Sequence, residues 1–205
     1  MPNLDLRFDD YTEQYAARQL AEAREFAQTT PLPDDLMVEI GSNRGRFLLE
    51  LARGNPDQFV LGIEIRGKYA RLSRRDLDRA EVRNAAVLCC DATLAFPIAI
   101  DDEQVSDVFM LYPDPWWKKK HRKRRVVRDE FLDTLHRKMK PGAHLWIRTD
   151  VGPLADDMRD VLMEHGGFEP VPPGEFPREP FPRSTRERKW IADGNPVNLV
   201  YFKRL

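Results

Sequence analysis

The chain has 205 residues, of which 41% are hydrophobic and 33% charged, and its formal net charge is -1. This is the composition of one ordinary globular domain, no apolar run is long enough to cross a membrane, and the overall charge gives no sign of a polyanionic partner. The first residues lack the basic-then-apolar order of a signal peptide. Cys89 and Cys90 are neighbours in an apolar run, which does not suit a disulfide or a metal site. We therefore expect a cytoplasmic protein with no metal and no membrane partner.

Apolar runs alternate with helical segments along the chain. Helices are expected at 9–28, 44–56, 66–82, 127–142 and 151–167. Strands are expected at 36–41, 58–65, 85–92, 105–115 and 143–150, and a proline-rich loop at 172–182 separates two last apolar segments, 168–172 and 198–205. Strands without polar alternation, separated by helices, predict a doubly wound α/β fold with a mostly parallel seven-stranded sheet. A helical extension, 1–35, would precede a single α/β domain, 36–205.

The first expected strand leads into a glycine-containing turn, "VEIGSNRGRF". Gly41 and Gly45 allow a ligand to approach the backbone closely before the helix begins. Asn43 stands where a nucleotide-binding loop often has glycine, and asparagine tolerates a positive φ better than most residues. Taken alone, the turn is equally well explained as an ordinary connection between a strand and a helix.

Acidic residues recur at the carboxyl ends of the expected strands, where such sheets bind ligands. Glu64 lies at about the interval where an acid binds ribose hydroxyls, and Asp91 suits an adenine amino group. Each acid alone is equally well explained as a solvated carboxylate at a strand end, but acids after three consecutive strands make that explanation less convincing. Several acids without a phosphate-binding lysine argue against ATP and favour a cationic nucleoside such as S-adenosylmethionine.

The stretch "LYPDPWWKKKHRKRRVVRDEF" joins an apolar strand to a strongly basic segment. Two prolines bracket Asp114 and fix it at the end of the strand. Trp116 and Trp117 could stack on a base or pack at the rim. A solvated surface is the ordinary explanation of a basic run, but charges of one sign behind this aspartate favour phosphate contacts. The predicted phosphate-binding residues are Lys119, Lys120, Arg122, Lys123, Arg124 and Arg125.

Five motifs, "VEIGSNRGRFLLELA", "LGIEI", "CDA", "YPDPWWKKKHRKRR" and "RTD", stand in an order and spacing that resemble a known family. From about Met37 to its C-terminus the chain resembles the bacterial tRNA (guanine-N7-)-methyltransferases, a branch of the class I S-adenosylmethionine-dependent methyltransferases. The resemblance implies a Rossmann-like methyltransferase domain at 36–205. It also implies an RNA-binding enzyme that transfers methyl to N7 of guanine 46 in the variable loop of tRNA, giving 7-methylguanosine.

The resemblance also assigns roles to single residues. It implies cofactor contacts at Glu39, Glu64, Asp91 and Asp114, beside the turn glycines Gly41 and Gly45, with Asp114 as the catalytic residue. It implies substrate contacts at Lys118 and Asp150, and at Ser184 and Glu187, where "STRERK" stands for the family motif T-x-x-E. The chain departs from the family at Asn43, at Trp117 and in its N-terminal region.

Three other functions remain as alternatives. A methyltransferase of another substrate would share the cofactor site but leaves the basic run unexplained. A non-catalytic RNA-binding relative would not need the strand-end carboxylates. A nicotinamide-dependent enzyme fits least, because the glycine pattern is interrupted. Both a monomer and a homodimer are compatible with the sequence.

Overall fold

The computed structural model describes residues 13–116, 125–172, 175 and 182–205. Its strands are β1 (Leu36–Ile40), β2 (Phe59–Ile63), β3 (Ala85–Leu88), β4 (Val105–Leu111), β5 (Met139–Thr149), β6 (Phe168–Pro170) and β7 (Asn198–Arg204). They form one sheet in the order β3-β2-β1-β4-β5-β7-β6. Within the described residues, β7 alone runs against its neighbours β5 and β6. The predicted α/β fold with a mostly parallel seven-stranded sheet is confirmed.

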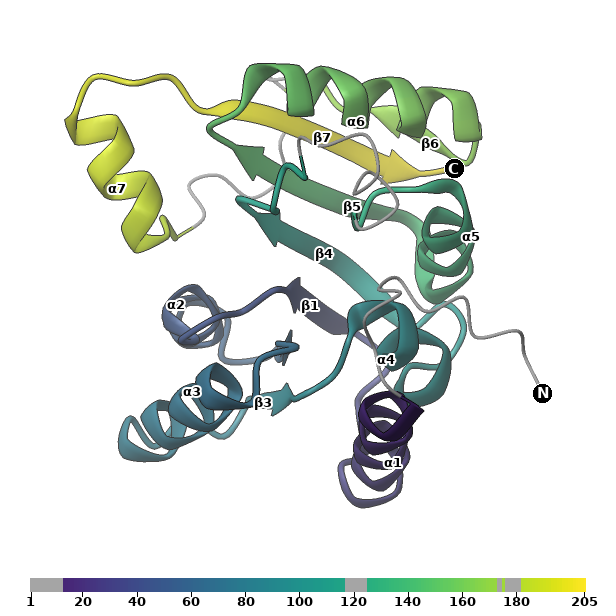
Figure 1. The fold of residues 1–205 in the computed structure, drawn as a ribbon, viewed down its shortest axis with the longest axis vertical. Coiled ribbons are helices and arrows are strands. Elements are labelled where there is room, and N and C mark those ends of the chain that lie inside the picture. The colour runs from purple at the N-terminus through teal and green to yellow at the C-terminus, as the bar shows by residue number, and fades with distance from the viewer. Residues whose placement is uncertain (1–12, 117–124, 173–174, 176–181) are drawn as a thin grey trace.

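Helices cover both faces of this sheet (Figure 1). They are α1 (Glu13–Thr29), α2 (Arg46–Gly54), α3 (Gly67–Arg79), α4 (Ala92–Ala99), α5 (Asp129–Lys138), α6 (Gly152–His165) and α7 (Thr185–Ala192). Side chains of α1, α4, α5 and α6 pack on one face, and side chains of α2 and α3 pack on the other. The strands are apolar on both sides because each side contacts a layer of helices.

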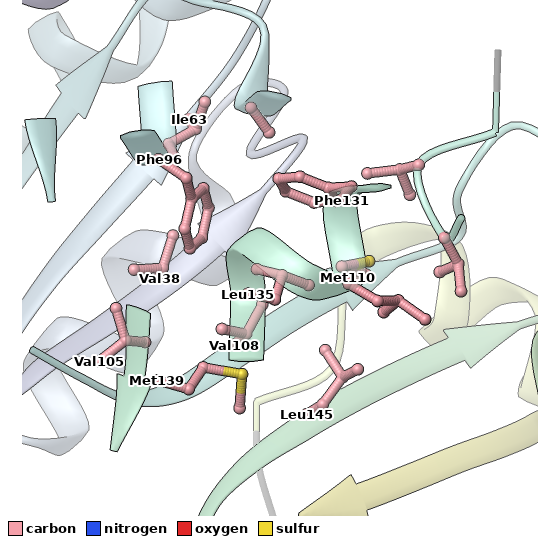
Figure 2. Packing of buried hydrophobic residues seen from close by; sticks show 14 of the residues in the cluster. Val38, Ile63, Phe96, Val105, Val108, Met110, Phe131, Leu135, Met139 and Leu145 are labelled. Atoms are coloured by element: carbon pink, nitrogen blue, oxygen red, sulfur yellow. The ribbon is translucent and has the colours of Figure 1, made fainter. Parts of the chain in front are cut away.

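The larger core cluster lies between the sheet and the layer that contains α4 and α5 (Figure 2). Val38 of β1 and Val108 of β4 are fully buried there. Phe96 of α4 and Phe131 of α5 meet edge to face, with ring centroids 5.5 Å apart, a geometry that adds to the free energy of burial. This packing holds α4 and α5 against one face of the sheet.

The structure corrects the sequence prediction for three helices, α4, α5 and α7. The sequence did not predict α4, because its segment is apolar apart from Thr93 and contains Pro97, so no helical periodicity is visible. α7 was also missed, although Ser184 and Glu187 have the spacing of a capping box. α5 ends at Lys138, before the predicted Pro-Gly turn, because β5 already begins at Met139.

The order of the strands reverses between β1 and β4. β1 pairs with β2 on one side and with β4 on the other, and the chain leaves these strands toward opposite edges of the sheet. A crevice forms at such a switch point, at the carboxyl ends of the strands. The glycine turn after β1 and the "YPDP" segment after β4 therefore meet at one place.

Candidate functional site

A cleft of about 380 Å³ lies at this switch point. Its lining combines the turn after β1, the end of β4 and the start of α7. The lining residues are Glu39, Gly41, Ser42, Asn43, Arg44, Arg46, Phe47, Tyr69, Leu111, Tyr112, Ser184 and Arg186. Segments from both halves of the sheet thus contribute to one ligand-sized space.

The turn between β1 and α2 has the backbone that its glycines permit. φ is 78° at Gly41, 50° at Asn43 and 69° at Gly45, so the expected positive φ at Asn43 is confirmed. A Cβ atom on Gly45 would lie 1.8 Å from the side-chain oxygen of Ser73 in α3. Glycine is therefore required there by space as well as by φ.

Two buried carboxylates stand behind this turn. Glu64 is 2% exposed, and its oxygens accept hydrogen bonds from the backbone N–H groups of Asn43 and Arg66, both at 2.8 Å. Glu39 is 3% exposed, and its Oε2 has no hydrogen-bond partner among the described residues. Burial, and then the charge of Glu64, raise the pKa of Glu39 to about 8. This pair leaves a buried acceptor available for a ligand with N–H groups or positive charge.

Asp91 lies after β3 and begins α4. Its Oδ1 accepts hydrogen bonds from the backbone N–H and the hydroxyl of Thr93, each at 2.9 Å, and so caps the helix. Its own N–H donates to Oε1 of Gln19 in α1 at 2.5 Å. The contact with Gln19 spans 72 positions, and no local pattern in the sequence could have revealed it.

A smaller cavity of about 130 Å³ lies between α1 and the ends of β2 and β3. The hydroxyl of Tyr15 in α1 donates to the carbonyl of Ile65 at 3.4 Å beside it. The cavity is lined by Tyr15, Arg18, Gln19, Glu22, Ile65, Gly67, Arg71 and Cys89. The N-terminal helix thus borders the same strand ends that carry Glu64 and Asp91.

The backbone is strained in the segment that follows β4. Tyr112 and Trp116 have φ values of 54° and 43°, which are uncommon for large side chains. Asp114 between them is exposed and, among the described residues, is not part of the cleft lining. The two prolines thus hold its carboxylate in solvent, two residues beyond Tyr112 of the cleft wall.

The two predicted substrate-binding residues of α7 have partners within the protein. Ser184 caps the helix, since its hydroxyl accepts the backbone N–H of Glu187 at 3.1 Å. The Glu187 carboxylate is 3% exposed and binds Nη1 of Arg148 at 3.0 Å. Arg148 also donates to the Tyr201 hydroxyl at 2.8 Å. A substrate contact of Glu187 therefore stays a prediction that requires this buried pair to open.

A second ion pair fastens α7 across the cleft. Arg188 binds both carboxylate oxygens of Glu50 in α2, at 2.5 and 2.6 Å. On the other side, Arg186 donates from Nε and Nη2 to Oδ2 of Asp150. The helix therefore bridges the two halves of the sheet at the mouth of the cleft.

Most of the predicted basic segment lies outside the described residues. This concerns Trp117, Lys118, Lys119, Lys120, Arg122, Lys123 and Arg124. Arg125 is described: its side chain is 14% exposed, and it binds Asp157 of α6 at 2.7 Å and the carbonyl of Pro115 at 3.1 Å. We therefore leave Arg125 out of the proposed phosphate contacts.

The described residues contain no group of three or more His, Cys, Asp and Glu side chains placed to bind a metal ion. Nor, within the same residues, is any helix both long and apolar enough to span a bilayer.

Comparison with known proteins identifies the relatives of this chain. Residues 33–199 match a family model described as "Putative methyltransferase". The tRNA (guanine-N(7)-)-methyltransferase of Myxococcus xanthus (strain DK1622) is 36% identical over 170 residues, which cover 79% of this chain and 80% of the relative. The protein of the same name from Thermosynechococcus vestitus is 31% identical over 193 residues, covering 89% of this chain and 91% of the relative.

The fold is shared more widely. The crystal structure of precorrin-6y C5,15-methyltransferase from Geobacter metallireducens GS-15 superposes with a TM-score of 0.57 at 17% identity, and the match covers 92% of this chain and 86% of that one. This likeness concerns the fold alone. The close relatives, in contrast, match over most of their length at more than 30% identity, and the chain therefore belongs to the tRNA (guanine-N7-)-methyltransferase family.

Proposed function

We propose that this protein transfers a methyl group from S-adenosylmethionine to N7 of a guanine in tRNA, and that the target is guanine 46. The observation that carries the proposal is the pair of buried carboxylates, Glu39 and Glu64, behind the glycine turn at the switch point. The names of the relatives support the reaction.

Glu39 and Gly41 line the cleft, and Gly45, Glu64 and Asp91 belong to the neighbouring turns at the same strand ends; together they would suit the cofactor. The Oε2 of Glu39, which has no hydrogen-bond partner in the described part of the chain, suits an ammonium or sulfonium group, because an opposite charge restores the interaction that burial removed. Glu64 would bind the ribose hydroxyls, and Asp91 the adenine amino group. Gly41 and Gly45 would allow the ligand to lie against the backbone. When bound, S-adenosylmethionine supplies an electrophilic methyl group.

The protein's own task is to orient guanine and to stabilise its developing positive charge. N7 carries an in-plane lone pair and no proton, so no strong general base is needed. The Watson–Crick edge presents N1–H and an amino group, which carboxylates accept and adenine cannot match. Asp114 and Asp150 are the proposed acceptors, and their charge offsets the charge that appears on the purine. Lys118 would assist them at the substrate.

Loss of the Glu64 side chain should weaken cofactor binding strongly. We expect Glu64→Ala to reduce the affinity for S-adenosylmethionine by about 1–3 kcal/mol, because a buried hydrogen-bonded contact is lost and the turn at Asn43 is released. Glu64→Gln keeps one acceptor and should lose less. Titration calorimetry measures both, and a Glu64→Ala protein with wild-type affinity would contradict the assignment.

The basic segment should make tRNA binding depend on salt. Replacing Arg122, Lys123 and Arg124 with alanine should lower the slope of log affinity against log salt by about one per lost phosphate contact. Arg125→Ala is the matched control: its partner is Asp157, so we expect a lower melting temperature and an unchanged slope. Equal slopes for the triple variant and the wild type would mean that the segment is only a solvated surface.

The proposed reaction is tested by mass analysis of nucleosides from tRNA incubated with the protein and S-adenosylmethionine. We expect 7-methylguanosine from tRNA with guanine at position 46 and none from the same tRNA with adenine there. Product from both tRNAs would refute the position. If the protein binds the cofactor but methylates neither tRNA, tRNA is not its substrate. If it binds tRNA but not the cofactor, the alternative of a non-catalytic RNA-binding protein is favoured.

A further inference from the structure

The side chain of Arg186 is held at two points in the cleft. At its edge, Nε donates to Oδ2 of Asp150 at 3.2 Å, and Nη2 donates to the same oxygen. At its face, the guanidinium carbon lies 5.4 Å from the centroid of the Tyr112 ring. A planar cation is thus bound by a carboxylate along its edge and by an aromatic ring against its plane.

These are the contacts that a guanine base would need. The guanidinium edge presents two parallel N–H donors on one carbon, and the Watson–Crick edge of guanine presents N1–H and the amino group in the same arrangement. Both groups are planar and stack on aromatic rings. Asp150 is a substrate-binding residue in the proposed function, so Arg186 binds the side chain that the base would use.

The backbone of Tyr112 is strained. Its φ of 54° is unfavourable for an aromatic residue, and such strain persists where surrounding structure enforces it, often at functional sites. Its hydroxyl is buried without a hydrogen-bond partner among the described residues. Burial and the charge of Glu187 raise the pKa of Tyr112 above its usual value, so the ring stays neutral. Tyr112 thus contributes a neutral aromatic ring to the cleft wall, and Arg186 lies over that ring.

We propose, on the basis of the proposed function, that Arg186 occupies the guanine position in the free protein and that the entering base displaces it from Asp150 and Tyr112. The Arg186 side chain is 62% exposed while that of Asp150 is 10% exposed. An ion pair with one solvated partner is weak and easily exchanged. Arg186 would therefore cover Asp150 until the base arrives, and Tyr112 would be the surface on which the unstacked base rests.

The test compares KM and kcat for tRNA among variants. Arg186→Gln should lower KM about two- to fivefold, the range expected from losing a weak competing ion pair. Arg188→Gln removes the same charge from the same helix but does not touch Asp150, so its KM should be unchanged or higher. In an Asp150→Asn background, Arg186→Gln should give no further decrease. Tyr112→Leu should raise KM roughly tenfold through lost stacking, and Tyr112→Phe should not.

The outcomes separate this inference from the proposed function. An increase in KM for Arg186→Gln as large as that for Arg188→Gln would mean that Arg186 contacts tRNA, and the inference would be wrong. An equal decrease in both Asp150 backgrounds would also overturn it. If the wild-type protein forms no 7-methylguanosine, the proposed function and this inference fail together. Melting curves of each variant confirm folding, which the exposure of Arg186 leads us to expect.

Discussion

Asp114→Asn is expected to slow methyl transfer to tRNA by about two to three powers of ten and to leave the melting temperature almost unchanged. The substitution keeps the size of the side chain and one acceptor but removes the charge that would offset the positive charge on the purine. Losing one electrostatic stabiliser in a reaction of this kind has an effect of about this size. The fold should not suffer, because Asp114 is exposed.

Single-turnover methylation at saturating cofactor, together with a melting curve, measures both effects. Asp57→Asn is a suitable control, because Asp57 is also exposed but lies before β2, at the opposite end of the strands. It should methylate at the wild-type rate. An Asp114→Asn protein that melts normally and shows wild-type turnover would remove Asp114 from the reaction.

Glu39→Gln is expected to change stability and cofactor binding in opposite directions. The pKa of Glu39 is raised from about 4.5 to about 8, so between these pH values the folded chain keeps a proton that the unfolded chain has lost. Stability therefore falls as pH rises across this window. Relative to the variant, the wild type should lose roughly 3 kcal/mol between pH 5.5 and pH 8.

Denaturant unfolding of both proteins at several pH values tests this sign. The variant should show the flatter profile and should be the more stable protein at pH 8. Its affinity for S-adenosylmethionine should nevertheless be lower, because glutamine offers no negative charge to a cationic ligand. If the unfolding free energies of the two proteins change with pH in parallel, the pKa of Glu39 is not raised. If the cofactor affinity is unchanged, the positive charge of the cofactor does not lie near Glu39.

The sequence predicted the sheet well because buried parallel strands are continuous apolar runs, visible without any knowledge of their neighbours. The sequence also identified three acidic residues of the site for the same reason, because each stands at or near the end of such a run: Glu39, Glu64 and Asp91. α4 was missed because Pro97 and the near-absence of polar residues conceal the helix, although the capping pair Asp91 and Thr93 was a usable signal.

The partners of the site residues could not be predicted. Gln19 beside Asp91, Arg148 beside Glu187 and Arg186 beside Asp150 are distant in the sequence and are brought together only by the fold. For Ser184 and Glu187 the spacing had two explanations, a substrate motif and a helix cap. The structure accounts for it by the cap, while the substrate contact stays open to experiment.

The reversed direction of β7 gives this architecture a modular character. Because β7 runs antiparallel to β5, its first residue, Asn198, pairs with Thr149 at the carboxyl end of β5. The helix that precedes it, α7, is thereby placed beyond the carboxyl ends of the strands rather than on a face of the sheet (Figure 1), and its Arg186 lines the cleft. The part of the cleft wall that α7 contributes can therefore vary without any change in the strands that carry Glu39 and precede Glu64. A chimaera carrying a relative's α7 should therefore keep the wild-type affinity for S-adenosylmethionine and change only in its affinity for tRNA.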